Sequence, residues 1–299
     1  MTFGKNKTEW RGADSFSKLK KYDKRFLKVL LFDKIREGKR FKMYYVVLRK
    51  RKLLSGLLAL VLTAAALTAL FATDAHAVFY GSNLKKLPIY SVETEEKKLS
   101  ISFDCAWGVD YTDKLLSAMA KEGVRCTFFT VEFWAEKHPE YLKKISDAGH
   151  EIGTHSATHP KMSKLSASAI DKELETSVNA IEKVIGKKVE LFRPPFGDYN
   201  DLLIERAKEA GLYTVQWSVD SLDWKDLSAK EIENRVLSRA KNGSIVLFHN
   251  QGLHTAEAIP NVIKTLKARG YEFVPIGELI YREKFSMRPD GAQVKNENA

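Results

Sequence analysis

The sequence has few cysteines and few histidines, two and seven respectively among 299 residues. Cys105 and Cys126 fall at opposite ends of two neighbouring predicted strands. Each strand residue adds about 3.3 Å, whereas a disulfide needs Cα atoms within ~7 Å of each other. The layout therefore argues against a disulfide between them, although an exported protein would permit one.

Most of the chain also lacks an excess of positive charge. Residues 1–52 carry a net charge of +13, and the remaining residues carry −2. A nucleic-acid partner needs basic side chains that neutralise phosphates, so the sequence argues against one for the main body. Apolar residues are not scarce, because 44% apolar and 29% charged is an ordinary globular mixture.

Residues 53–73 form an uncharged run rich in Leu and Ala, directly after the basic RKRK of residues 49–52. This length suffices to span a bilayer, and the preceding charges predict a cytoplasmic N-terminus with the rest outside. The run exceeds the ~7–15 residues of a signal-peptide core, which favours a retained single-pass anchor in the cell membrane. A small-x-small pattern ending at Ala77 leaves open a secreted protein cleaved there.

Residues 1–52 are interpreted as a basic cytoplasmic arm. Starting at Met43 would leave MYYVVLRKRK, a short basic lead of conventional type. We therefore expect residues 1–42 to reflect a wrongly assigned start. Peptides from residues 1–42 in the native protein would contradict this expectation.

After a polar linker at residues 78–96, short apolar runs alternate with amphipathic stretches. Six stretches each end at a glycine, a residue that commonly closes a helix, and the alternation predicts a parallel sheet covered by helices. We expect a distorted (β/α)7 barrel at residues 97–281, preceded by one N-terminal hydrophobic helix and followed by a polar tail at residues 282–299. The predicted strands are residues 99–103, 126–131, 150–154, 189–192, 213–217, 244–248 and 271–275, and the predicted helices are residues 112–122, 138–148, 166–185, 200–210, 228–242 and 255–269.

The unusual polar residues follow the ends of these predicted strands. His155 and His159 are four residues apart, a spacing at which two imidazoles can bind one metal ion. Seven histidines can produce such a pair by chance, so the spacing alone proves no site. In parallel barrels, however, the carboxyl ends of the strands converge on one mouth. The other residues at these positions are Asp104, Arg193, Asp220, Asp223 and His249.

These residues, in this order, resemble the polysaccharide deacetylases of carbohydrate esterase family 4, the NodB-like domains that remove acetyl groups from N-acetylated glycans. Five segments carry the resemblance: SFDCAWG (102–108), THSATHP (154–160), RPPFG (193–197), DSLDW (220–224) and IVLFH (245–249). The resemblance implies a hydrolase acting on carbon–nitrogen bonds other than peptide bonds.

The resemblance also implies the roles of individual residues. Asp104 is the expected general base, held by Arg193, and His249 is the expected general acid, oriented by Asp223. The substrate would be bound by Phe196, whose backbone N–H faces the oxyanion, together with Trp224, Leu247 and Trp107. The metal, a divalent ion and by expectation zinc, would be bound by His155, His159 and the residue at position 105.

Position 105 departs from the family pattern, in which a second aspartate completes the metal site. Three explanations remain open. Cys105 itself binds the metal as a thiolate, or Asp110 or water supplies the ligand, or metal binding is weak or absent and Cys105 is a small buried apolar residue.

The FDCAWG segment resembles the branch of the family associated with spore formation. The substrate implied is therefore peptidoglycan or a related wall glycan. A catalytically impaired glycan-binding relative, and a deacylase of other acetylated polysaccharides, are the alternatives. The expected contacts are the wall glycan and the membrane through residues 53–73, and no obligate protein partner is evident from the sequence.

Overall fold

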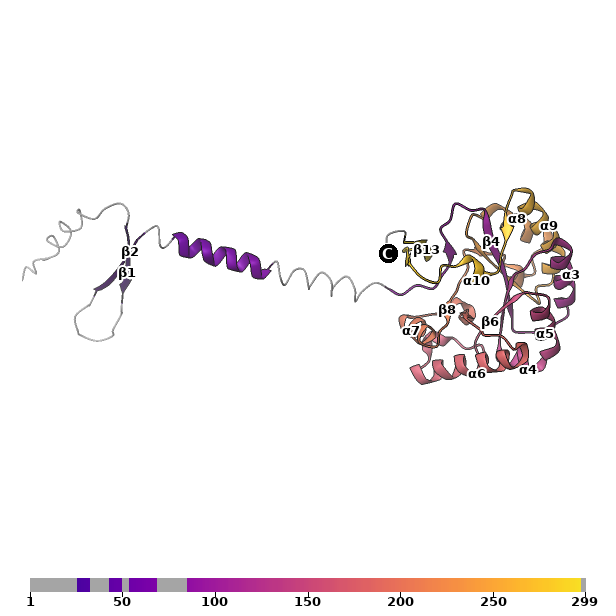
Figure 1. Cartoon of the computed structure of the whole chain (residues 1–299). Coiled ribbons are helices and arrows are strands. Elements are labelled where there is room, and N and C mark those ends of the chain that lie inside the picture. The colour runs from indigo at the N-terminus through magenta and orange to yellow at the C-terminus, as the bar shows by residue number, and fades with distance from the viewer. Residues whose placement is uncertain (1–25, 33–42, 50–53, 69–84, 297–299) are drawn as a thin grey trace, which may run out of the picture. The chain divides into compact units, whose positions relative to one another are not determined.

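The computed structural model describes residues 26–32, 43–49, 54–68 and 85–296 (Figure 1). They divide between two compact units, Met1–Leu84 and Lys85–Ala299. Each unit is described by itself.

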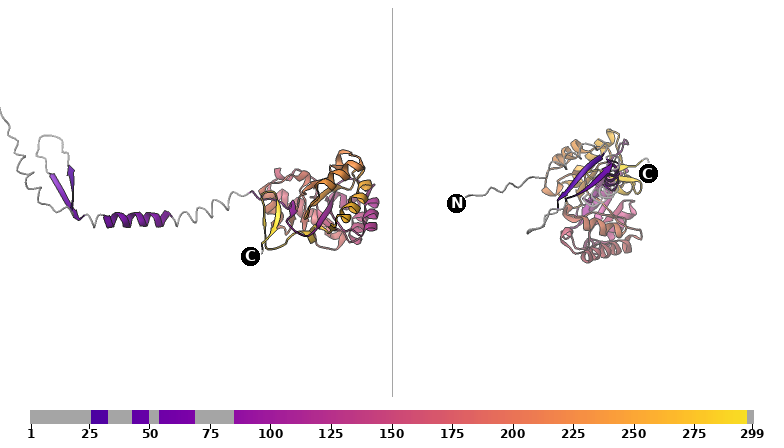
Figure 2. Two further views of the ribbon diagram at one scale, coloured as in Figure 1. Left: turned by 90° about the horizontal axis from the view of Figure 1, so that it is seen from above. Right: turned by 90° about the vertical axis from the view of Figure 1, so that its left-hand side faces the viewer.

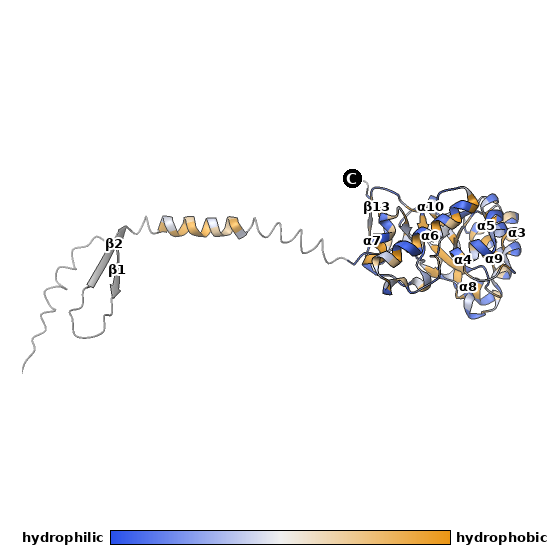
Figure 3. Cartoon of the chain, turned by 90° about the horizontal axis from the view of Figure 1, so that it is seen from below, coloured by the Kyte–Doolittle hydropathy of each residue, from blue (hydrophilic) through white to orange (hydrophobic). Residues whose placement is uncertain are grey.

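In the first unit, β1 (Phe26–Phe32) and β2 (Met43–Arg49) pair as antiparallel strands that the sequence did not lead us to expect. Residues 54–68 form a helix, coloured mostly as hydrophobic in Figure 3. The predicted apolar run is longer, but residues 53 and 69–73, like the predicted cleavage site, lie outside the described residues. Of the helices that are described, none is long and apolar enough to cross a membrane.

The second unit is built on a sheet with the strand order β8-β7-β6-β5-β4-β10-β9, and β11 pairs with β4. Every neighbouring pair in this sheet is parallel. The helices lie outside the strands (Figure 1 and Figure 2). The predicted distorted (β/α)7 barrel is confirmed. The strands are β4 (Lys98–Cys105), β5 (Thr127–Thr130), β6 (Glu151–Thr154), β7 (Leu191–Phe192), β8 (Tyr213–Thr214), β9 (Val219–Asp220), β10 (Ile245–His249) and β11 (Glu272–Phe273).

All six predicted helices are present, and short helices α4 and α10 are additional. Polar side chains cap the N-termini of three of these helices. Ser166 and Asn200 each accept a hydrogen bond from the third backbone N–H of the helix that follows, and Ser228 forms a capping box with Glu231. The helices are α3 (Thr112–Glu122), α4 (Glu132–Lys137), α5 (Pro139–Asp147), α6 (Ala167–Ile185), α7 (Asp201–Glu209), α8 (Ala229–Arg239), α9 (Thr255–Ala268) and α10 (Ile276–Leu279).

One of the six glycines has a different role from the predicted one. Helix α8 ends at Arg239, so Gly243 does not close it. Gly243 has φ of 69°, its carbonyl oxygen accepts a hydrogen bond from the N–H of Val92, and a Cβ there would lie 1.6 Å from the Val92 carbonyl oxygen. The glycine is required because another backbone segment passes against it.

That neighbouring segment shows that the predicted linker and tail are partly folded. β3 (Ser91–Val92) pairs in parallel with β13 (Ala292–Lys295), which pairs antiparallel with β12 (Phe285–Met287). Both ends of the described segment 85–296 therefore join the second unit. Their backbone hydrogen bonds join segments about 200 residues apart in sequence, which no local sequence pattern signals.

The alternation of side chains along β4 separates two environments. Leu99, Ile101, Phe103 and Cys105 belong to a large hydrophobic cluster shared with the helices. Ser100 and Ser102 lie on the other face, where their hydroxyls donate to the carbonyl oxygens of Val274 and Val246. Asp104 continues this second series, and the alternation carries it to the carboxyl end of the strand on the same face.

Candidate functional site

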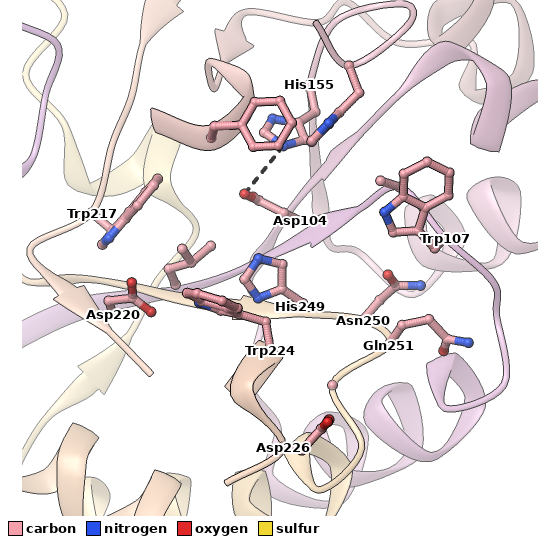
Figure 4. Close-up of a pocket in the computed structure, with 15 residues that line it drawn as sticks. Asp104, Trp107, His155, Trp217, Asp220, Trp224, Asp226, His249, Asn250 and Gln251 are labelled. Atoms are coloured by element: carbon pink, nitrogen blue, oxygen red, sulfur yellow. Dashed lines mark ion pairs between the residues drawn. The ribbon is translucent and has the colours of Figure 1, made fainter. Parts of the chain in front are cut away.

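The strand ends of the second unit surround a cavity of about 700 Å³ (Figure 4). Asp104 and His249 are register partners on the adjacent parallel strands β4 and β10, so their side chains lie side by side at its floor. Such strands lie about 4.8 Å apart. The cavity is lined by Asp104, Ala106, Trp107, His155, His159, Phe196, Trp217, Asp220, Trp224, Asp226, Leu247, His249, Asn250, Gln251 and Gly252.

Asp104 forms a buried ion pair with Arg193, which follows β7. Nη1 of Arg193 donates to Oδ1 of Asp104 over 2.8 Å, and Nη2 donates to the backbone oxygen of Gln216 over 3.1 Å. The guanidinium also stacks against the Phe129 ring, 4.1 Å from its centroid. Burial by itself would raise the pKa of Asp104, but the charge and the hydrogen bond of Arg193 outweigh it and hold the pKa below its usual value. The carboxylate is therefore ionised at neutral pH.

His249 and Asp223 form a second pair at the cavity floor, in which a carboxylate is bound to an imidazole ring. Asp223, in the 3-10 helix Asp223–Lys225, is fully buried, and its Oδ1 accepts from Nδ1 of His249 over 2.8 Å. Its Oδ2 accepts from the His249 backbone N–H and from the Thr255 hydroxyl. Burial alone would lower the pKa of His249, but the hydrogen bond and charge of Asp223 outweigh it, and the pKa is raised. Because Nδ1 is engaged, Nε2 is the nitrogen free for proton transfer.

The histidine loop follows β6 in a strained conformation. Ser156 and His159 have φ of 76° and 59°, a region that non-glycine residues rarely occupy. Glu173 of α6 fixes the loop by accepting hydrogen bonds from the backbone N–H groups of Ala157 and Thr158 and from the Thr158 hydroxyl. These charge-assisted bonds offset strain of about 1–3 kcal/mol per residue.

The two histidines of the loop lie together, as predicted, with ring centroids 5.0 Å apart. Nδ1 of the buried His155 bonds the Arg193 carbonyl oxygen over 2.7 Å, so it carries the proton and Nε2 is unprotonated. Nε2 lies 3.5 Å from Oδ2 of Asp104. Burial is the main cause that lowers the pKa of His155 to about 4, and the imidazole is therefore neutral at pH 7.

Cys105 lies apart from this group. Its side chain is fully buried within the hydrophobic cluster of Leu99, Ile101 and Phe103, and the residue does not line the cavity. Burial raises the pKa of the Cys105 thiol well above its usual value, so a thiolate is strongly disfavoured. This position favours the third explanation, in which Cys105 is a small buried apolar residue, and its role as a metal ligand stays a prediction. Cys105 and Cys126 are both free thiols.

Asp110 does not replace the missing ligand either, because its Oδ2 accepts a hydrogen bond from Nε2 of Gln251 and it does not line the cavity. Within the described part of the chain, no three His, Cys, Asp or Glu residues are grouped to hold a metal ion. Asp104, the carboxylate beside His155, is already bound by Arg193. The donor set therefore does not fit the divalent metal that the resemblance implies.

The residues expected to bind substrate all line the cavity. Leu247 is almost fully buried, whereas Trp107, Phe196 and Trp224 are 65%, 63% and 55% exposed. The Phe196 ring lies 4.5 Å from the His159 ring, and its backbone has φ of 60°. That its N–H receives an oxyanion stays a prediction. The ring of Trp107 lies 5.4 Å from that of Phe133, which supports it from behind.

Some residues of the site were missed by sequence reasoning. Thr255 and Glu173 come from helices distant in sequence from the groups that they hold, and Trp217, Asp226 and Gln251 line the cavity outside the five motifs or at their edges. Only the position of Trp217, at the end of a predicted strand, offered a signal.

The geometry places an ionised carboxylate beside a histidine with a raised pKa. The first can accept a proton from water and the second can donate one to a leaving group, which is the division of roles that acid–base hydrolysis requires. The site therefore contains one group suited to accept a proton and one suited to donate it.

Comparison with known proteins agrees with this class. A family model described as Polysaccharide deacetylase matches residues 91–215. The chain is 33% identical over 202 residues to Peptidoglycan-N-acetylmuramic acid deacetylase PdaA of Bacillus subtilis, covering 66% of this chain and 77% of that protein. The chain therefore belongs to the polysaccharide deacetylase family.

Two further relatives are informative. The chain is 35% identical over 198 residues to YlxY of Bacillus subtilis, described as uncharacterized, and the match covers 66% of this chain and 62% of YlxY. The crystal structure of BA3943 from Bacillus anthracis, described as a carbohydrate esterase family 4 pseudoenzyme, matches with a TM-score of 0.64 and 32% identity, over 72% of this chain and 75% of that one.

Proposed function

We propose that the second unit binds an N-acetylated cell-wall glycan of the peptidoglycan type and hydrolyses the acetamide group of one sugar. The observation that carries the proposal is the pairing of Asp104 with His249 on adjacent strands, with pKa values shifted in opposite directions. Groups tuned in this way can act as base and acid at the same pH.

In the proposed reaction, Asp104 removes a proton from a water molecule, whose oxygen adds to the acetamide carbonyl carbon. Nε2 of His249 then donates a proton to the amide nitrogen as the carbon–nitrogen bond breaks, which releases acetic acid and a free amine; the acid then loses its proton to the solvent. One proton then passes through water from Asp104 to His249 and restores both groups. Arg193 keeps Asp104 ionised before the reaction, and Asp223 accepts from Nδ1 of His249 and so leaves its Nε2 directed to the leaving group.

The test is acetate release from purified wall glycan and from chito-oligomers by the full-length chain, with and without added zinc. Release that is abolished by Asp104→Asn and by His249→Gln would support the proposal. No release from any acetylated glycan under any metal condition would overturn it.

A second candidate is a protein that binds wall glycan without turnover. The burial of Cys105 and the missing third ligand favour it, and BA3943 is described as a pseudoenzyme. Saturable glycan binding without acetate release would identify this function. Because the Cys105 thiol does not line the cavity, we expect that added metal would not restore acetate release through this residue.

We also propose that the chain acts outside the cytoplasm in a spore-forming bacterium. The support is the uncharged run of residues 53–73 behind a basic segment, together with the FDCAWG segment. N-terminal sequencing of the native protein would distinguish a retained anchor from cleavage near Ala77. Unchanged abundance of the protein between growth and sporulation would contradict the second part.

A further inference from the structure

Apart from His249, which is cationic when it acts as the acid, the charged groups that line the cavity are carboxylates. Asp104 is neutralised by Arg193, whereas Asp220 and Asp226 form no ion pair with any basic side chain among the described residues. Apart from the histidines, whose role is in the chemistry, the lining contains no basic side chain. In Figure 4 the two aspartates lie on either side of Trp224.

Two basic side chains contact lining residues without lining the cavity themselves. Lys225 places its ammonium 4.9 Å from the centroid of the Trp224 ring, and Nε of Arg235 donates to the backbone oxygen of Asp220 over 2.6 Å. Neither residue lines the cavity. Oδ1 of Asp220 is held by the Leu222 N–H, so that carboxylate is fixed in position.

The other lining groups suit an uncharged sugar. Trp107 and Trp224 expose more than half of their surface at the cavity, and such rings stack on the apolar faces of pyranose units. Oε1 of Gln251 is buried and accepts no hydrogen bond from the described residues.

We propose that Asp220 and Asp226 make this cavity selective for uncharged N-acetylhexosamine units and against units that carry a carboxylate, such as the lactyl acid of a muramyl sugar. The inference rests on the proposed glycan function and deepens it. It separates this chain from PdaA, which is described as an N-acetylmuramic acid deacetylase. The physical reason is the repulsion between like charges within one partly desolvated cavity.

The experiment compares two tetrasaccharides that differ at the lactyl group: alternating N-acetylglucosamine and N-acetylmuramic acid units with free lactyl carboxylates, and the same chain with these carboxylates converted to uncharged methylamides. Binding to the full-length chain is followed by NMR titration, and released acetate is read in the same spectra. We expect the amide to bind about three- to tenfold more tightly at 20 mM salt, and this ratio to approach one at 0.5 M salt.

Asp220→Asn and Asp226→Asn should each reduce the ratio, and the double variant should bring it close to one. Asp147→Asn removes an exposed carboxylate from α5, outside the cavity, and should leave the ratio unchanged. Lys225→Gln should leave the preference for the amide in place or increase it, because it removes a positive charge beside the Trp224 ring.

Equal binding of both tetrasaccharides, or tighter binding of the acid, would overturn the inference while leaving a glycan function in place. Failure of both to bind would overturn the proposed function itself. Preference for the amide without acetate release would support the inference and favour the binding function over the enzyme.

Discussion

Replacing Asp223 by asparagine tests how the pocket controls His249. Asp223 is fully buried, and its two oxygens accept three hydrogen bonds of 2.8, 2.8 and 2.6 Å from the His249 ring, the His249 backbone and the Thr255 hydroxyl. Asparagine has nearly the same shape but no charge. Its single acceptor oxygen can serve only one side of this arrangement.

The less costly orientation keeps the amide oxygen toward the His249 backbone and Thr255, because two donors converge there. The amide NH₂ then faces Nδ1 of His249 and forces the ring proton onto Nε2. A hydrogen bond to a charged group contributes about 1.5–3 kcal/mol and a neutral one about 1 kcal/mol. Part of this loss is offset by the smaller desolvation cost of an amide, so we expect a destabilisation of about 2 kcal/mol.

The pKa of His249 should fall in this variant, because the hydrogen bond and charge of Asp223 are the largest causes that raise it, ahead of the charges of Asp104 and Asp220. A raised histidine pKa contributes stability that is complete below the unfolded-state value and is lost as the pH rises through the folded-state value. The destabilisation caused by Asp223→Asn should therefore be larger at pH 6 than at pH 9. Any acetate release should fall by about 10²–10⁴-fold.

The assay is an NMR titration of the His249 ring nitrogens in the full-length chain, combined with urea unfolding at both pH values. Asp226→Asn is the matched control, because it removes a cavity carboxylate that has no hydrogen bond to His249. An unchanged pKa and tautomer of His249 in Asp223→Asn would refute the assigned role of Asp223, whether or not the chain is an enzyme.

Three further predictions follow from the buried groups. Asp104→Asn leaves the buried guanidinium of Arg193 without its counter-ion, so it should lose about 3–5 kcal/mol of stability and all measurable acetate release; release that persists would contradict the base assignment. Cys105→Ala should cost only about 1 kcal/mol and leave metal content and acetate release unchanged, and loss of bound metal would restore the thiolate hypothesis. Burial lowers the pKa of His150 from 6.5 to about 4, so the unfolded chain binds its proton first and stability falls as the pH drops below 6.5. In urea unfolding, the His150→Gln variant should therefore lose about 2 kcal/mol less stability between pH 7 and pH 5 than the unmodified chain does. The same pH dependence in both would show that His150 is not buried in its neutral form.

The alternation of strands and helices was predictable because its signals are local. Apolar runs and helix-ending glycines recur along the chain, and the six predicted helices and seven predicted strands are present with small shifts at their ends. The short strand β9 was missed because it contains two residues and is recognisable only through its pairing with β10. Strands β3, β12 and β13 were missed for the same reason.

The candidate site was predictable to the extent that strand ends converge. Asp104, Arg193, Asp223 and His249 were singled out from their positions and from the family resemblance, and the structure brings all four to one floor. The sequence could not reveal that Glu173 holds the histidine loop. That contact depends on how α6 packs against the loop.

The sequence by itself determined the class of fold, the order of its elements and the residue types available for acid–base chemistry, because these depend on periodicity and composition along the chain. Only the tertiary structure decided which of those residues meet. It paired Asp104 with His249 through the register of β4 and β10, and it placed Cys105 in the hydrophobic cluster because β4 continues through residue 105 and the next side chain in a strand points to the opposite face. Whether the side chain at position 105 faces the cavity thus depends on whether β4 extends through that residue. Hydrogen bonding between strands determines the length of β4, and no local sequence pattern does.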